Sequence, residues 1–302
     1  MTAASPVAGY ILALIQAVLY ACMGIIGKYL YGTGLNPQQV MVLRFVMTFV
    51  ILGAFLLVWR KQKLFSRRPL VYVQGVFFMS SALFYFLAVD EVSAGLATAL
   101  LYAYPAVVAF LTAIAFREKL TKRTVAAVVL ALGGIIAIAG ILEDTVTLSP
   151  IGILYGVAAC VTFAIYTVIG QKVVEKEGSF TITFSLTTVS LVMLVFMFPT
   201  TFPELLSFTP LQLGLGATMA VFTTILPVVA LLAAIKIIGA TKAALISIAE
   251  TPISLGLAYL MFGETLTIMQ GVGCVLIVAS IFAVTLPQRT KKLPAEEAEK
   301  GE

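Results

Sequence analysis

One carboxylate lies deep inside a long apolar stretch of this 302-residue sequence. Glu250 comes eight positions after Lys242, about 12 Å along a helix that rises 1.5 Å per residue. A carboxylate near the middle of a membrane costs on the order of 3 kcal/mol, which makes it a functional candidate. Ser247, Thr251 and Ser254 share its helical face through spacings of three and four residues. This face could bind a polar solute and exchange a proton, or Glu250 could be a buried structural carboxylate.

Two cations also lie within apolar stretches. Arg44 could hold the carboxylate or phosphate of a solute with its planar guanidinium, or it could pair with Glu250 or cap a broken helix end. Lys28 could line the same site, or its ammonium could simply extend to the membrane surface. The sequence leaves these alternatives open.

A polar and aromatic stripe follows the first apolar stretch. Gln16, Tyr20, Gly24 and Lys28 recur at every fourth position, which places them on one face of a helix. Such a stripe would run from the middle of the membrane to its outer face. The same tyrosine could instead pack in the core or at a membrane interface.

A second group lies where a proline interrupts an apolar stretch. Thr98 and Tyr102 share a helical face, and Tyr104 directly precedes Pro105. Proline lacks a backbone donor, so Pro105 and its counterpart Pro252 are expected to bend or break their helices. The carbonyl groups released by a break could then bind a ligand or water.

These residues must be held by membrane helices, because the composition excludes a water-soluble globule. The sequence is 61% hydrophobic and 11% charged, whereas soluble domains are roughly 45 to 50% apolar and about 25% charged. It has no histidine, and Cys22, Cys160 and Cys274 lie in apolar runs without the spacing of metal ligands. We therefore expect no metal, no cofactor and no enzyme activity, since one isolated carboxylate offers no catalytic pair.

Ten stretches are long and apolar enough for a membrane-spanning helix of about 20 residues. The short breaks between them leave no room for a soluble domain, and the first stretch is too long for a signal-peptide core. The sequence thus predicts an all-α integral membrane protein of ten transmembrane helices. The expected spans are 7–30, 39–59, 69–89, 94–116, 123–142, 150–171, 180–199, 211–235, 242–262 and 267–287.

The loop charges separate by sign if there are ten spans. Basic residues then collect on one side, and the opposite loops carry carboxylates without lysine or arginine. By the positive-inside rule both termini are cytoplasmic, in a multi-pass protein of the inner membrane. The positive net charge therefore reports orientation and gives no reason to expect nucleic acid. The basic residues are Arg60, Lys61, Lys63, Arg67, Arg68, Arg117, Lys119, Lys122, Arg123, Lys172, Lys176, Lys236, Lys242, Arg289, Lys291, Lys292 and Lys300; the acidic ones are Asp90, Glu91, Glu143, Asp144, Glu204 and Glu264.

The chain also contains an internal duplication. The run from Glu118 to Thr121 (EKLT) recurs 146 positions later as Glu264 to Thr267 (ETLT), and Pro105 recurs 147 positions later as Pro252. Five spans is an odd number, so the second half enters the membrane from the opposite face and the two five-helix repeats are inverted. We expect a first repeat at 1–146, a second at 147–287 and a charged cytoplasmic tail at 288–302.

The repeated blocks resemble a known family. Tyr104-Pro105 followed by Phe116 to Thr121, and Glu250-Thr251-Pro252 followed by Phe262 to Thr267, look like the EamA-like permeases of the drug/metabolite transporter superfamily. The first block departs from the family pattern at Arg117, where a glycine is usual. The resemblance implies ten helices in a five-plus-five inverted repeat around a central cavity that carries small organic solutes.

The resulting hypothesis is a secondary transporter of small organic metabolites such as amino acids. It would work as an exporter or exchanger by alternating access, with proton coupling through Glu250, since no nucleotide-binding motif is present. Its partners would be the solute, the proton and the lipid bilayer, and the protein would be a monomer or homodimer. A lipid or lipid-conjugate flippase and a non-transporting membrane scaffold are the alternatives.

Overall fold

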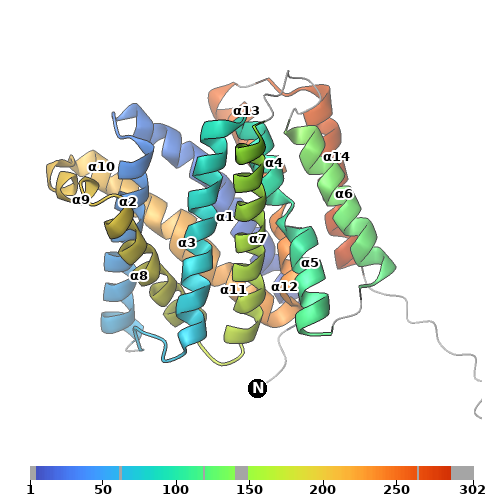
Figure 1. Ribbon diagram of the computed structural model, residues 1–302, viewed down its shortest axis with the longest axis horizontal. Helices are drawn as coiled ribbons and strands as arrows, with labels where there is room; N and C mark the ends of the chain where they lie inside the picture. Colours follow the sequence, from blue (N-terminus) through green and yellow to red (C-terminus); the bar gives the residue numbers. More distant parts are fainter. Residues whose placement is uncertain (1–4, 61–62, 118–119, 140–148, 264, 287–302) are drawn as a thin grey trace, which may run out of the picture.

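The computed structural model describes residues 5–60, 63–117, 120–139, 149–263 and 265–286, and all regular elements in these ranges are helical. The predicted all-α fold is confirmed. The elements are α1 (Pro6–Gly32), α2 (Pro37–Ala54), η1 (Phe55–Arg60), α3 (Pro69–Glu91), α4 (Ala94–Tyr102), α5 (Tyr104–Ala115), α6 (Lys122–Ile138), α7 (Pro150–Val173), α8 (Ser179–Met197), α9 (Thr201–Glu204), η2 (Leu205–Ser207), α10 (Pro210–Ala220), η3 (Val221–Ile225), α11 (Leu226–Ile238), α12 (Ala240–Ser247), α13 (Glu250–Phe262) and α14 (Ile268–Thr285) (Figure 1).

Nine helical segments of the described chain are long and apolar enough to cross a membrane, and each lies at a predicted span. The remaining predicted span, 123–142, is the fifth in chain order and corresponds to α6, whose 17 described residues pack along α14. Some predicted features lie outside the described residues. They are the tail 288–302, Lys61, Glu118, Lys119, Glu143, Asp144, Glu264, Arg289, Lys291, Lys292 and Lys300.

Local sequence signals explain where these helices begin. Proline occupies the first position of α1, α2, α3, α7 and α10, where its missing N–H has no helical partner to lose. At α2, Asn36 and Gln39 form a capping box, in which each side-chain oxygen accepts the other residue's backbone N–H at 2.8 Å. The helices therefore begin close to the predicted positions.

The first helix of each repeat packs mainly against a helix of the other repeat. Helix α1 packs mainly against α11, and its repeat counterpart α7 packs mainly against α3. The two helices run in opposite directions through the bundle (Figure 1). The pairs α6 with α14 and α2 with α8 complete this pseudo-twofold arrangement. The two repeats are therefore inverted and interlocked.

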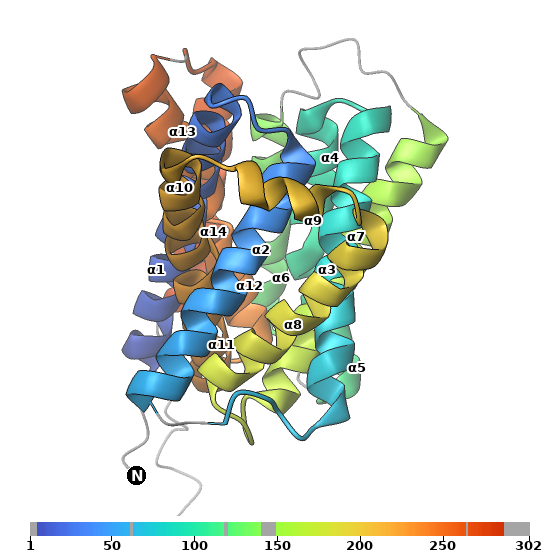
Figure 2. The same cartoon turned by 90° about the vertical axis from the view of Figure 1, so that its left-hand side faces the viewer.

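The two ends of the bundle differ in charge. The start of α1 and the α7–α8 loop lie at one end, and the α3–α4 loop lies at the other (Figure 2). We call the first the basic end and the second, with Asp90, Glu91 and Glu204, the acidic end. Glu175 and Glu177 also lie at the basic end, in the α7–α8 loop. The described cations at the basic end are Lys63, Arg67, Arg68, Arg117, Lys122, Arg123, Lys172, Lys176, Lys236 and Lys242.

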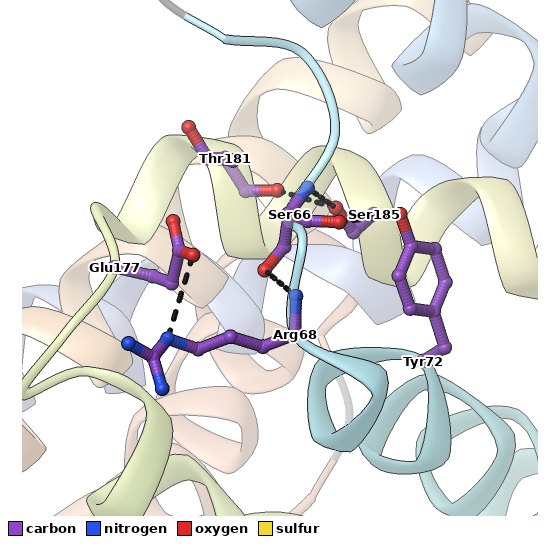
Figure 3. A network of polar contacts seen from close by, with 6 residues as sticks. All are labelled: Ser66, Arg68, Tyr72, Glu177, Thr181 and Ser185. Carbon is purple, nitrogen blue, oxygen red and sulfur yellow. Dashed lines mark hydrogen bonds and ion pairs between the residues drawn. The ribbon is translucent and has the colours of Figure 1, made fainter.

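A polar network fastens the segment before α3 to helix α8 at the basic end (Figure 3). The backbone N–H of Ser66 donates to Ser185 Oγ at 3.0 Å, and the Tyr72 hydroxyl donates to the Ser66 carbonyl at 2.8 Å. Arg68 Nε lies 3.6 Å from a carboxylate oxygen of Glu177. This network links the two halves of the chain at the membrane surface.

Candidate functional site

The ninth span is broken between α12 and α13, directly before Glu250. The N–H of Ala249 donates to the Ile246 carbonyl, and the N–H of Thr251 donates to the Ile248 carbonyl, both at 3.0 Å. Both bonds span three residues, so the chain is wound more tightly than an α-helix at this point. Pro252 has no N–H to offer the Ile248 carbonyl, and Thr251 takes its place. The Ile248 carbonyl is therefore bonded, and the polar group at the break is the Glu250 side chain.

The fourth span is broken in the same way between α4 and α5. Ala103 joins the two helices, and Pro105 follows within the first turn of α5. The N–H of Ala106 donates to the Ala103 carbonyl at 3.1 Å. The two breaks therefore occupy equivalent places in the two repeats.

Glu250 faces a group of tyrosines between the two breaks. The Tyr102 side chain lies next to the Glu250 carboxyl group, close enough to interact with it. Tyr104, Tyr20 and Arg44 also lie close enough to interact electrostatically with this carboxyl group. The structure therefore brings four of the predicted site residues around Glu250, from α1, α2, α4 and α5.

Buried polar contacts join α12 to α1 and α5 on the basic side of this group. The Ser247 hydroxyl donates to Gln16 Oε1, and both side chains are buried. The Tyr104 hydroxyl donates to the Ala244 carbonyl at 3.3 Å. Thr112 and Thr241 share a hydrogen bond of 2.7 Å between α5 and α12. These contacts hold the broken spans together between Glu250 and the basic end.

Arg44 is buried and holds the π-helical turn η3 in the eighth span. Its Nε donates to Thr224 Oγ1 at 2.6 Å, and its Nη2 donates to the Thr223 carbonyl at 2.9 Å. Its Nη1 contacts the sulfur of Met23 at 3.4 Å. Pro227 lacks the N–H that an α-helix would offer to the Thr223 carbonyl, so a guanidinium donor suits this place. Arg44 thus bonds an irregular turn of another span, and whether it also holds a solute stays a prediction.

The remaining predicted residues lie farther from Glu250 or make fewer contacts. The Thr98 and Tyr85 hydroxyls share a hydrogen bond of 3.0 Å. The Lys28 ammonium lies 3.8 Å from the centre of the Phe262 ring. Thr251 Oγ1 is buried without a hydrogen-bond partner among the described residues. Ser254 is half-buried on α13.

Helix α7 contributes aromatic residues that the sequence reasoning missed. Phe163 packs edge-on against Tyr104 with ring centres 4.7 Å apart, and Tyr166 lies 5.3 Å from Phe163. The Tyr166 hydroxyl is buried without a hydrogen-bond partner among the described residues. A tyrosine at mid-span in the counterpart of the first helix is the signal that could have drawn attention to it.

The two halves of the ninth span are packed to different degrees. Helix α12 packs against α5, α1, α7 and α11, and all its residues except Lys242 are buried. Helix α13 has no buried residue, and within the described chain it does not pack substantially on α4. Along the α1 stripe, Gln16 is buried and Gly24 and Lys28 are exposed. Glu250, at the junction of the two halves, is partly exposed.

Comparisons with known proteins agree on the class of molecule. A family model described as the EamA-like transporter family matches residues 7–140 and again 150–286. A Bacillus subtilis protein named as an uncharacterized transporter, YcbK, is 27% identical over 97% of this chain and 96% of its own length. A Rickettsia bellii protein named as an S-adenosylmethionine uptake transporter is 28% identical over 83% of this chain and 84% of its own.

A solved crystal structure shares the fold. It superposes with a TM-score of 0.75 over 93% of this chain and 97% of the other, at 17% sequence identity. At this identity the likeness establishes the arrangement of helices alone.

Proposed function

Because this chain belongs to the EamA-like transporter family, we propose that it is a secondary transporter of small organic solutes that works by alternating access. The observation that carries the proposal is the one-sided packing around Glu250. Helices α12 and α5 close the basic end, whereas α13 is left without buried residues toward the acidic end. A site packed tightly toward one end and less tightly toward the other suits a transporter that opens to each side in turn.

The proposed solutes carry a positively charged amino group, as amino acids do. An ionised Glu250 would attract such a group, and the rings of Tyr20, Tyr102 and Tyr104 would surround its apolar part. Arg44 would hold η3 in place through Thr223 and Thr224, and would contribute its charge from there. The named solute of the Rickettsia relatives, S-adenosylmethionine, also carries an amino group.

In the proposed cycle Glu250 binds either the solute or a proton. The uncovered side of α13 lets protons reach Glu250 from the acidic end, and protonation releases the solute there. The protein then works as an exporter or exchanger, driven by the proton gradient. The positive-inside rule favours a cytoplasmic location for the basic end and for both termini.

Flux into liposomes tests the role of Glu250. Purified protein is reconstituted, and counterflow is measured with a panel of amino acids, amines without an acid group and acids without an amine. We expect counterflow of the amine-bearing solutes, and we expect E250Q to lose the part of the flux that a pH gradient drives. E175Q removes a carboxylate from the surface loop at the basic end and should keep this flux. Full gradient-driven flux in E250Q would contradict the proposed coupling.

A further inference from the structure

A cavity of about 350 Å³ lies at the basic end, away from Glu250. It is enclosed by the ends of α1, α6, α11, α12 and α14, and its polar lining belongs mainly to α6 and α12. Neither the predicted site nor the transport proposal uses it. Its lining residues include Tyr10, Thr121, Arg123, Thr124, Gly239, Lys242 and Thr285.

The lining of this cavity suits an anion. Arg123 comes from the first turn of α6 and Lys242 from the first turn of α12, and the described lining includes no carboxylate. The Arg123 Nη1 donates to the Leu286 carbonyl at 3.3 Å, which fixes the guanidinium at the cavity wall. The α6 N-terminus lies beside these charges. Thr121 caps it by accepting the Thr124 N–H at 3.2 Å, and the Thr121 and Thr124 hydroxyls bond each other at 3.0 Å, which leaves one hydroxyl proton for an anion.

An apolar groove continues from the cavity along the outside of the bundle. Its volume is about 120 Å³, and it runs between α5 and α6. Leu120 and Thr124 line both the cavity and the groove, so the two spaces adjoin. Phe110 and Val129 in the groove are 60% and 62% exposed. The apolar groove therefore leads away from the cationic cavity at the membrane surface.

We propose that the cavity and groove together bind one anionic phospholipid. The phosphate lies in the cavity near Arg123 and Lys242, and an acyl chain lies along the groove beside Val129. Cationic pockets between helices at a membrane surface suit anionic lipid headgroups. A lipid seated here ties α6 to α12, and α12 is the helix that closes the basic end. This inference concerns the lipid surface and does not depend on the identity of the transported solute.

Thermal unfolding of the full chain in detergent tests the headgroup site. We expect phosphatidylglycerol to raise the unfolding temperature and phosphatidylcholine to leave it unchanged. The variant R123Q/K242Q should need a higher phosphatidylglycerol concentration for the same shift, by roughly fivefold for each cation removed. K172Q/K176Q removes two exposed cations from the same end but outside the cavity, and it should behave as the wild type. An equal loss in both double variants would overturn the site.

Filling the groove distinguishes a lipid from a soluble phosphate. V129W places a large ring on an exposed position of the groove, so the protein should still fold. We expect V129W to weaken the effect of phosphatidylglycerol, and we expect inorganic phosphate at the same concentration to stabilise neither protein. Equal stabilisation by inorganic phosphate and by the lipid, unaffected by V129W, would assign the cavity to a soluble anion and overturn the proposal.

Discussion

The fourth and ninth spans have the same pattern and different surroundings. Both are broken near mid-span, and each carries a proline just after the break. In the fourth span both halves, α4 and α5, pack against α7. In the ninth span α12 is buried among six neighbouring helices, whereas α13 packs mainly on α1. The repeated sequence pattern therefore determines where each helix breaks. The neighbouring helices determine which half is packed less tightly and is free to move.

Two serines on one face of the ninth span should react very differently with an aqueous thiol reagent. Ser247 on α12 is 3% exposed, and Ser254 lies two turns later on the half-buried α13. With Cys22, Cys160 and Cys274 replaced by serine, we expect an impermeant reagent at the acidic end to label S254C and to leave S247C unlabelled. Mass spectrometry of the labelled protein gives the measurement. Equal labelling of S247C and S254C would show that α12 and α13 are equally accessible and would contradict this prediction.

Enlarging one alanine in each half should separate the two halves by stability. Ala244 on α12 is fully buried and Ala258 on α13 is half-buried. Extra methylene groups in a packed core typically cost about 1 to 3 kcal/mol, so A244L should lower the unfolding temperature. A258L has space toward the surface and should cost less than about 0.5 kcal/mol. A greater loss of stability in A258L than in A244L would mean that α13 is the more tightly packed half.

The smallest effect is expected from the hydrogen bond that joins α5 to α12. Thr241 Oγ1 lies 2.7 Å from Thr112 Oγ1, and Thr112 also bonds the carbonyls of its own helix. T241V keeps the shape and loses one bond, for an expected cost of about 0.5 to 1.5 kcal/mol in unfolding free energy. T218V removes an exposed hydroxyl and serves as the control. If the double variant T112V/T241V lost as much unfolding free energy as the single variants T112V and T241V lose together, the two hydroxyls would not be coupled.

The membrane fold was largely predictable because it follows from length, apolarity and loop charge. Spans such as 150–171 and 180–199 differ from α7 and α8 by a few residues, since proline and glycine mark their starts. The break inside the eighth span was not predicted. Pro227, directly after turn η3, was a local signal that was not used. The contact of Arg44 with Thr224, 180 positions away, leaves no local pattern.

The candidate site was only partly predictable. The polar type and helical spacing of Glu250, Tyr102 and Tyr20 were visible because an apolar background makes such residues conspicuous. Phe163 and Tyr166 looked like ordinary apolar lining, and only the packing of α7 against α5 brings them beside Tyr104. Which face of a membrane helix meets which neighbour is decided by tertiary packing, so these residues required the structure.

The exchange of α1 and α7 between the repeats has a consequence for folding during synthesis. A nascent chain that ends before α7 has no partner for the face of α3 that α7 covers, and its α1 lacks α11. The first half would therefore remain incomplete until the second half has entered the membrane. A fragment limited to one half could cover the exposed faces of its α1 and α3 only by pairing with a second copy inserted in the opposite orientation. The single chain instead supplies two antiparallel halves in a fixed one-to-one ratio.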